Sequence, residues 1–523
     1  MEIKDLTLNS SLPPAWWRPL IIILLVLGIF FRLANLDRKI YWRDEALTSL
    51  QISGYTIAEA TQGLADGREL SIADLQKYQN INSERNLFNT VKALAIETPE
   101  HPPVYYAIAR LWAERFGTSQ TAMRSLPAIL SLFVFPCLYW LCLELFASPA
   151  VAWVAIALVA VSPFHVLYAQ EAREYSFWTA TTLLASAALL RAMRLNTAKS
   201  WTIYTLSLAL ALYSYLFSVF VAIGHGIYAI VSERFQFNKK SINYLLSAIA
   251  GTLLFLPWII VLIINLPALH KSMAWINYRF TISELIWRWI FNINRIFIDW
   301  NYGWSFRTPF PYLIIISNLL LVGYALYFLC RHTPPRIWVF VLSLSGVILL
   351  ALVLPDLIIG GGRSKVQRYL IPFYLGIQIA VAYLLATKIT SVSVSSNQKK
   401  IWQLVTAVII SGGVLSCALS SQASVWWHKS DTKDIPQIVQ TTKKAKRPLI
   451  VSDALITNLL SLSHQLDPKV KFQLFTNSEA VKIAAGYSDV FLFAPSPELQ
   501  KKIEKDRKLE LVRDTNRLWR IEN

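Results

Sequence analysis

The sequence is poor in charged residues and has few cysteines. Only 16% of its 523 residues are charged, whereas 55% are hydrophobic, and this balance indicates a polytopic membrane protein rather than a soluble globular one. The four cysteines, Cys137, Cys142, Cys330 and Cys417, lie in or at the ends of apolar segments and lack the paired spacing of metal ligands. We therefore expect neither a disulfide framework nor a zinc site.

Two further signals are missing from the sequence. No small-residue cleavage site follows the first apolar run, so we expect a retained helix rather than a cleaved signal peptide. No glycine-rich phosphate loop is present in the C-terminal part, so we assign it no nucleotide binding. The formal charge of +18 does not indicate nucleic acid as a partner, because the basic residues lie in short loops between apolar runs.

Long apolar runs dominate the first 420 residues. Because about 20 apolar residues span a bilayer, eleven segments are predicted to cross the membrane. They are 18–36, 122–146, 150–168, 176–195, 201–216, 217–232, 241–264, 310–330, 337–355, 369–387 and 401–420. The run 201–232 is divided in two because it is too long for one crossing.

Lysines and arginines gather in alternate loops and set the orientation. These residues are Arg191, Arg194, Lys199, Arg234, Lys239, Lys240, Arg331, Arg336, Lys388, Lys399 and Lys400. The positive-inside rule makes their side cytoplasmic. The N-terminus is then cytoplasmic, and an odd number of crossings places the C-terminus outside. The outer side receives a first loop over 37–121, a second over about 265–309 and a third over 355–368.

The first outer loop carries two local signals. Ser71 and Asp74 have the spacing of a helix-capping pair. Val104–Phe116 is too short and too charged to cross comfortably, so we expect an amphipathic helix lying in the membrane interface. The alternative is a twelfth crossing, which would invert every later loop and break the charge rule.

The composition changes from about Ser421 onward, where apolar runs shorten. The segments 448–453, 470–475, 489–493 and 509–513 are predicted strands with helical patterns between them. The expected fold is thus an α-helical polytopic membrane domain over 1–420, followed by a small α/β domain over 421–523 on the outer face.

Charged residues cluster where the predicted outer helix ends meet the lipid headgroups. Asp44 and Glu45 follow the first crossing, between Tyr41 and Ala46, and a charged cluster beside a bilayer predicts a functional site. The alternative is an ordinary polar helix end with interfacial aromatic residues. Asp44 and Glu45 are the candidate catalytic residues. The candidate substrate-binding residues on this side are Glu100, His101, Tyr168, Glu171, Arg173, Tyr175, Arg363, Lys365, Arg368 and Tyr369.

These residue types suit a phosphorylated lipid that carries a sugar. Guanidinium groups bind phosphate bidentately, and a carboxylate is a general base for a hydroxyl or an amine. A phosphate leaving group needs charge stabilisation more than a protonating acid. Simpler alternatives remain open: Glu171 and Arg173 as a helix-end ion pair, and His101 as a helix cap. Arg363 and Lys365 have the alternative of plain loop charges, and His165 and His225 are expected to be buried structural groups.

The order of these pieces resembles the GT-C glycosyltransferases. The matching stretches are Asp44-Glu45, Glu100 to Tyr106, Gly117 with Arg124 to Pro127, Tyr168 to Arg173, and Arg368 to Pro372. The resemblance covers about residues 18–390. It is to the protein O-mannosyltransferase-like branch, which includes the bacterial aminoarabinose transferases.

This resemblance implies an inverting transfer from a polyprenyl-phosphate sugar, with Asp44 as the catalytic base and His101 and Glu171 as family positions. Aminoarabinose transferases have a lysine where this chain has His101, and the β-trefoil domain of yeast-type mannosyltransferases has no counterpart here. The implied protein is a glycosyltransferase of the bacterial inner membrane that acts on a lipid, glycan or protein acceptor. A lipid-linked polysaccharide polymerase or ligase, or a transporter, is the alternative. The resemblance implies no definite cofactor, and a divalent metal at Asp44 and Glu45 stays open.

Overall fold

The computed structural model describes residues 17–301, 309–476 and 481–522. The chain divides into two compact units. The first, here called the helical unit, comprises 1–34, 99–105 and 124–422. The second, here called the sheet unit, comprises 35–98, 106–123 and 423–523.

The helical unit contains every segment predicted to cross the membrane. Its longer helices are α1 (Trp17–Leu33), α7 (Gln120–Leu132, from Arg124 on), α8 (Val134–Phe146), α9 (Pro149–Ala160), α10 (Pro163–Ala169), α11 (Tyr175–Leu195), α12 (Ala198–Ser214), α13 (Ser218–Ser232), α14 (Lys239–Leu254), α15 (Leu256–Ile264), α18 (Phe310–His332), α19 (Pro335–Ile358), α20 (Ile371–Thr390) and α21 (Ser396–Gln422). The second outer loop adds α16 (Leu266–Ser272), η2 (Ala274–Asn277) and α17 (Ile282–Asn294), and η3 (Gln367–Leu370) precedes α20. Each predicted segment is thus occupied by one helix or by two consecutive helices.

The predicted number of crossings is not confirmed. Among the described residues, 5 helices are long and apolar enough to span a membrane, or up to 7 if each bent pair counts as one span. The bent pairs are α9 with α10, at 61°, and α14 with α15, at 54°. Pro163 and Pro257 stand at the start of the second helix of each pair, because proline removes a backbone donor but is tolerated in a first helical turn. The number of long apolar helices makes the chain a multi-pass membrane protein.

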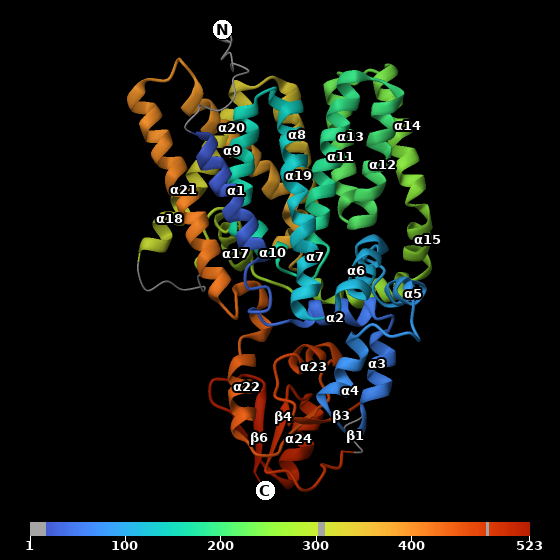
Figure 1. Cartoon of the computed structure of the whole chain (residues 1–523). Coiled ribbons are helices and arrows are strands. Elements are labelled where there is room, and N and C mark those ends of the chain that lie inside the picture. The colour runs from blue at the N-terminus through green and yellow to red at the C-terminus, as the bar shows by residue number, and fades with distance from the viewer. Residues whose placement is uncertain (1–16, 302–308, 477–480, 523) are drawn as a thin grey trace. The chain divides into compact units, whose positions relative to one another are not determined.

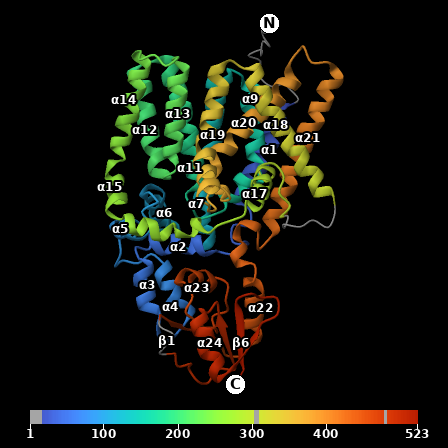
Figure 2. The same cartoon turned by 180° about the vertical axis from the view of Figure 1, so that it is seen from behind.

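The division of the 201–232 run is confirmed. Helix α12 ends at Ser214, Tyr215 is extended with φ −162° and ψ 135°, and α13 begins at Ser218. Helices α11 to α14 pack side by side, as both views show (Figures 1 and 2).

Buried polar groups tie the helices of this unit together. Arg32 of α1 donates to the carbonyl oxygens of Ala160 at 2.6 Å and Val159 at 3.1 Å. His165 lies 2.8 Å from the Gln378 amide oxygen, and His225 lies 3.1 Å from the Ser186 hydroxyl. Both histidines are buried structural groups, as expected from the sequence.

The sheet unit is built on a six-stranded mixed sheet. Its order is β1-β3-β2-β4-β6-β5, with strands β1 (Asp66–Leu70), β2 (Pro448–Ser452), β3 (Lys471–Phe475), β4 (Asp489–Phe493), β5 (Lys508–Leu511) and β6 (Leu518–Glu522). Strand β2 is parallel to β3 and β4, and the outer pairings are antiparallel. The four predicted strands are present as β2 to β5. Strand β1 comes from the first outer loop, which the predicted α/β domain over 421–523 did not include.

Short helices complete the sheet unit. The first loop forms α2 (Arg43–Ile52), α3 (Ile57–Leu64), α4 (Ile72–Gln76), η1 (Lys77–Gln79), α5 (Leu87–Glu97) and α6 (Pro103–Phe116, from Tyr106 on), and the C-terminal part forms η4 (Trp427–Thr432), α22 (Ile435–Lys444), α23 (Ile456–Ser463) and α24 (Pro497–Asp506). The predicted capping pair is confirmed, since the backbone N–H of Ser71 donates to the Asp74 carboxylate at 2.7 Å.

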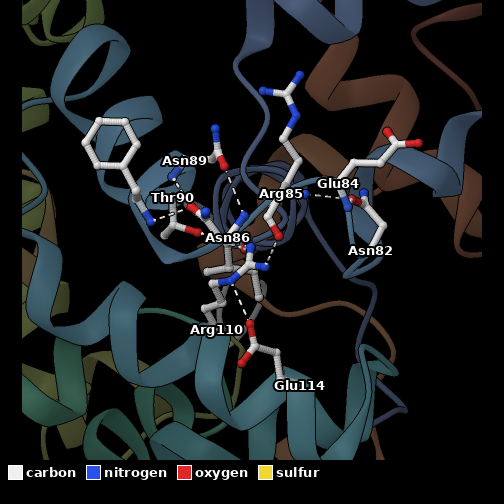
Figure 3. A network of polar contacts seen from close by, with 10 residues as sticks. Asn82, Glu84, Arg85, Asn86, Asn89, Thr90, Arg110 and Glu114 are labelled. Carbon is white, nitrogen blue, oxygen red and sulfur yellow. Dashed lines mark hydrogen bonds and ion pairs between the residues drawn. The ribbon is translucent and has the colours of Figure 1, made fainter.

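Arg110 joins the helices of the first loop (Figure 3). Its guanidinium donates to the carbonyl oxygens of Ile52 at 2.7 Å and Arg85 at 2.6 Å, and to the Glu114 carboxylate at 2.8 Å. The positive charge of Arg110 in α6 is therefore used in contacts within the sheet unit. The 14-residue helix is not among the candidate spans found in the described residues, and its position in the membrane interface stays a prediction.

Candidate active site

The acidic pair Asp44-Glu45 lies in the first turn of α2, after Trp42 as the N-cap. A helix N-terminus stabilises carboxylates through its exposed N–H groups and its dipole. The Asp44 side chain keeps 15% of its surface exposed, and Arg43 Nε lies 3.6 Å from one of its oxygens. Asp44 is thus a carboxylate that solvent or a ligand reaches.

Glu45 has a different environment. Its side chain is fully buried, and Oε2 lies 2.6 Å from Lys429 Nζ, which is itself 1% exposed. The backbone N–H of Trp42 donates to the same oxygen at 3.4 Å. Two adjacent carboxylates therefore have unlike properties: Glu45 is held inside the sheet unit, whereas Asp44 suits a reaction with a ligand.

A second cluster lies in the helical unit and joins His101 to the α10–α11 connection. His101 Nδ1 lies 2.8 Å from Glu174 Oε1, and Arg173 Nη2 lies 3.0 Å from His101 Nε2. Arg173 Nε lies 3.4 Å from the other Glu174 oxygen. Because a guanidinium only donates, Nε2 accepts in this contact and Nδ1 carries the proton that faces Glu174. The contacts exceed those of a simple helix cap at His101.

Glu174 belongs to this cluster, although the sequence did not single it out as a candidate site residue. Burial acts to raise the pKa of its carboxyl, but the charge of Arg173 and the electrostatic and hydrogen-bonding contact with His101 outweigh burial and hold that pKa at about 2. Its side chain is 1% exposed, so it orients Arg173 and His101 and does not itself meet a ligand. The available signal was its position next to Arg173 within the Tyr168 to Tyr175 stretch.

Two arginines flank one tyrosine ring in the helical unit. The guanidinium carbons of Arg173 and Arg368 lie 5.8 and 5.6 Å from the centroid of the Tyr175 ring. Arg368 also lies 5.6 Å from the ring of Tyr369, and Tyr168 packs edge-on against Tyr175 at 5.4 Å. Aromatic faces hold guanidinium groups in place through cation–π contacts. This arrangement, here called the arginine–tyrosine cluster, has the chemistry of a phosphate site.

In the loop 355–368, Arg363 makes several contacts that fix the loop conformation. Arg363 Nη1 lies 3.1 Å from Asp356 and donates to the Gly360 carbonyl at 3.0 Å, and Nη2 donates to Asn277 at 2.8 Å. Gly360 and Gly361 have φ of 87° and 133°, a conformation that favours glycine. Arg363 thus stabilises the conformation of this loop. A substrate-binding role for Arg363 stays a prediction. Lys365 lies 3.7 Å from the centroid of the Phe280 ring.

The structure divides the predicted site residues between the two units. Asp44 and Glu45 lie in the sheet unit, and all the predicted substrate-binding residues lie in the helical unit. Within the part of the chain that the structure describes, no group of three or more His, Cys, Asp or Glu side chains has the arrangement of a metal site. Glu45 is engaged by Lys429, so the acidic pair does not fit a divalent metal ligand set, and we derive no step through one.

Comparison with solved structures shows the fold of the chain. The chain has the GT-C fold. It is similar over 97% of its length to ArnT from Cupriavidus metallidurans, in the apo state (14% identity, TM-score 0.52, 97% of that chain) and bound to undecaprenyl phosphate (15% identity, TM-score 0.50, 98% of that chain). It is also similar to the archaeal oligosaccharyltransferase AglB from Archaeoglobus fulgidus, in complex with an inhibitory peptide and a dolichol-phosphate. That match has 12% identity and a TM-score of 0.50, and covers 86% of this chain and 64% of that one.

The more particular match is to a sequence family. The family model described as dolichyl-phosphate-mannose-protein mannosyltransferase matches residues 100–261, which include His101, Arg173 and Tyr175. No curated protein matches the sequence. The resemblance seen in the sequence motifs is therefore confirmed for the superfamily and the branch.

Proposed function

We propose that this protein is an inverting glycosyltransferase that moves a sugar from a polyprenyl-phosphate donor to an acceptor on the outer face of the bacterial cytoplasmic membrane. The observation that carries the proposal is the arginine–tyrosine cluster, in which Arg173 and Arg368 flank Tyr175. The fold supports it, since solved structures of the same fold hold undecaprenyl phosphate or a dolichol-phosphate.

The donor phosphate is the natural ligand of the arginine–tyrosine cluster. As the bond between the sugar C1 and the phosphate oxygen breaks, negative charge grows on the departing phosphate. Fixed guanidinium groups stabilise such charge without reorganising during the reaction. His101 and Glu174 hold Arg173 in place through contacts of 3.0 and 3.4 Å and contact each other at 2.8 Å, so this part of the site is preorganised.

Asp44 is the proposed base. It takes the proton of the acceptor hydroxyl or amine as the acceptor atom bonds to C1 from the face opposite the phosphate, which inverts the anomeric centre. The electron pair of the breaking C1–O bond leaves with the phosphate. One base and the cations suffice, because a phosphate departs as a stable anion and needs no protonating acid.

The direct test uses the purified protein in nanodiscs with a panel of radiolabelled polyprenyl-phosphate sugars. The expected result is donor-dependent transfer to a lipid, glycan or protein fraction, with loss of donor binding in Arg368→Ala. Lys399→Ala, on a predicted cytoplasmic loop, is the matched control for the removal of a positive charge. A wild-type protein that binds no polyprenyl-phosphate sugar under any condition would contradict the proposal.

A further inference from the structure

The turn at the start of α2, Ile40–Glu45, makes several hydrogen bonds with the C-terminal part of the chain. All of these contacts lie within the sheet unit. The backbone N–H of Ile40 donates to the Ser424 carbonyl at 3.0 Å, and Lys429 Nζ donates to the Ile40 carbonyl at 3.0 Å. The same ammonium group lies 2.6 Å from Glu45, across 384 positions of sequence. Lys429 therefore bridges the two ends of the Ile40–Glu45 turn.

A second set of contacts holds the same turn from α23 and η4. The Ser461 hydroxyl donates to the Tyr41 carbonyl at 2.6 Å, and the rings of Tyr41 and His464 lie 4.7 Å apart. The ring of Trp42 lies 6.4 Å from that of His428. Residues 40, 41, 42 and 45 thus each contact the C-terminal part, while Asp44 in the same turn keeps an exposed edge.

The buried ion pair between Lys429 and Glu45 fixes the local geometry more than it stabilises the fold. A buried ion pair is rarely more stabilising than a well-packed apolar pair of similar volume, because two charges lose their hydration. A charged pair does, however, fix one geometry, since each partner must meet the other. Here the geometry that it fixes is the first turn of α2, which carries the proposed base.

We propose that Lys429 is a positioning residue for Asp44. It neutralises Glu45 and bridges Glu45 to Ile40, and so sets the direction of the Asp44 carboxylate. The C-terminal part of the chain is then a component of the transferase site and not an accessory domain. This inference rests on the proposed function, and it predicts that Lys429 affects the chemical step and not the binding of the donor.

The test compares four full-length proteins in nanodiscs: wild type, Lys429→Met, Lys429→Met with Glu45→Gln, and Lys433→Met. Lys433 is an exposed lysine of the same segment and is the matched control. Lys429→Met is expected to lower kcat about a hundredfold, the order of loss for a misplaced reacting group, while the donor Kd stays unchanged. The double variant buries no unpaired charge and should recover about tenfold of the lost kcat, but stay below wild type because the bridge to Ile40 is still missing. Lys433→Met should match wild type.

Hydrogen–deuterium exchange provides a readout that needs no activity. Backbone amides of the 40–52 segment should exchange faster in Lys429→Met and return toward the wild-type rate in the double variant. Equal exchange in all four proteins would show that the contacts of Lys429 with Ile40 and Glu45 do not stabilise this segment, and would overturn the inference.

The remaining outcomes separate this inference from the proposed function. Wild-type kcat in a folded Lys429→Met protein would overturn the positioning role while leaving the transferase intact. If Lys429→Met fails to fold, the double variant decides, and full wild-type kcat there would contradict the inference. A wild-type protein that neither binds nor uses any polyprenyl-phosphate sugar would instead contradict the proposed function. The exchange data would still test whether Lys429 stabilises the 40–52 segment.

Discussion

Replacing Glu174 by glutamine tests the preorganised half of the site. The carboxylate is buried, with Arg173 and His101 against it, and its pKa is held at about 2 against an ordinary value of 4.5. That difference corresponds to about 3 kcal/mol of preference for the ionised form in the folded protein. Glutamine keeps the shape but removes the charge, so Arg173 loses its contact with a carboxylate and the folded state loses stability of this order at neutral pH.

The pH dependence follows from the direction of the shift. Because the pKa of Glu174 is lowered by folding, its contribution to stability is complete above about pH 4.5 and is lost as the pH falls toward 2. Thermal unfolding in detergent, followed from pH 7 down to 3, should show a loss of stability on acidification that is weaker in Glu174→Gln. The variant should also start from a lower Tm at pH 7.

Glu59→Gln is the control for this experiment. Glu59 pairs with Arg85 at 3.0 Å, but its side chain is 40% exposed, and exposed pairs contribute about 0–1 kcal/mol. A Glu174→Gln protein with the wild-type Tm and the wild-type acid profile would refute the reasoning about this cluster.

Three further predictions concern separate parts of the chain. Arg368→Ala should weaken donor binding about tenfold to a hundredfold, as expected for the loss of a charge-assisted contact, and Arg368→Lys should restore only part, because lysine lacks the planar fork; unchanged binding in a titration with polyprenyl phosphate would argue against this role. Arg110→Met should destabilise the first loop by about 1.5–3 kcal/mol, since the carbonyls of Ile52 and Arg85 lose a charged donor, and unaltered rates of limited proteolysis within 37–121 would count against it. An alkaline phosphatase fused after Asn523 should be active, because the basic loops predict an outer C-terminus, whereas activity of a cytoplasmic reporter at that point would reverse the orientation.

The helices were predictable because their signal is local. Long apolar runs identified the helices of the eleven predicted membrane segments, and the change of composition near Ser421 identified four strands. The short helices α2, α3, α5, α16 and α17 of the intervening loops carry no such run and were not predicted. Strand β1 escaped because Asp66–Leu70 has a single buried residue, Leu70, and no alternation. Its pairing with β3 joins segments about 400 positions apart, which no local pattern predicts.

The sequence supplied candidate site residues but not the contacts that they make. The motif stretches supplied Asp44, His101, Arg173 and Arg368, because aromatic and charged residues beside a bilayer are conspicuous. Lys429 gave no signal, since it stands in a polar segment whose lysines look solvated and its partner is 384 positions away.

The central claim is that Asp44 is the base of a sugar transfer from a lipid phosphate, and Asp44→Asn tests it most directly. Asparagine keeps the shape of the side chain but cannot accept the proton, and general-base catalysis is worth about a hundred- to ten-thousandfold in rate. With purified proteins in nanodiscs at matched concentration, the account predicts donor-dependent transfer by wild type. It predicts a loss of this size in Asp44→Asn, with donor binding retained, and a smaller loss in Glu45→Gln. An Asp44→Asn protein that turns over its donor at near the wild-type rate would contradict the account.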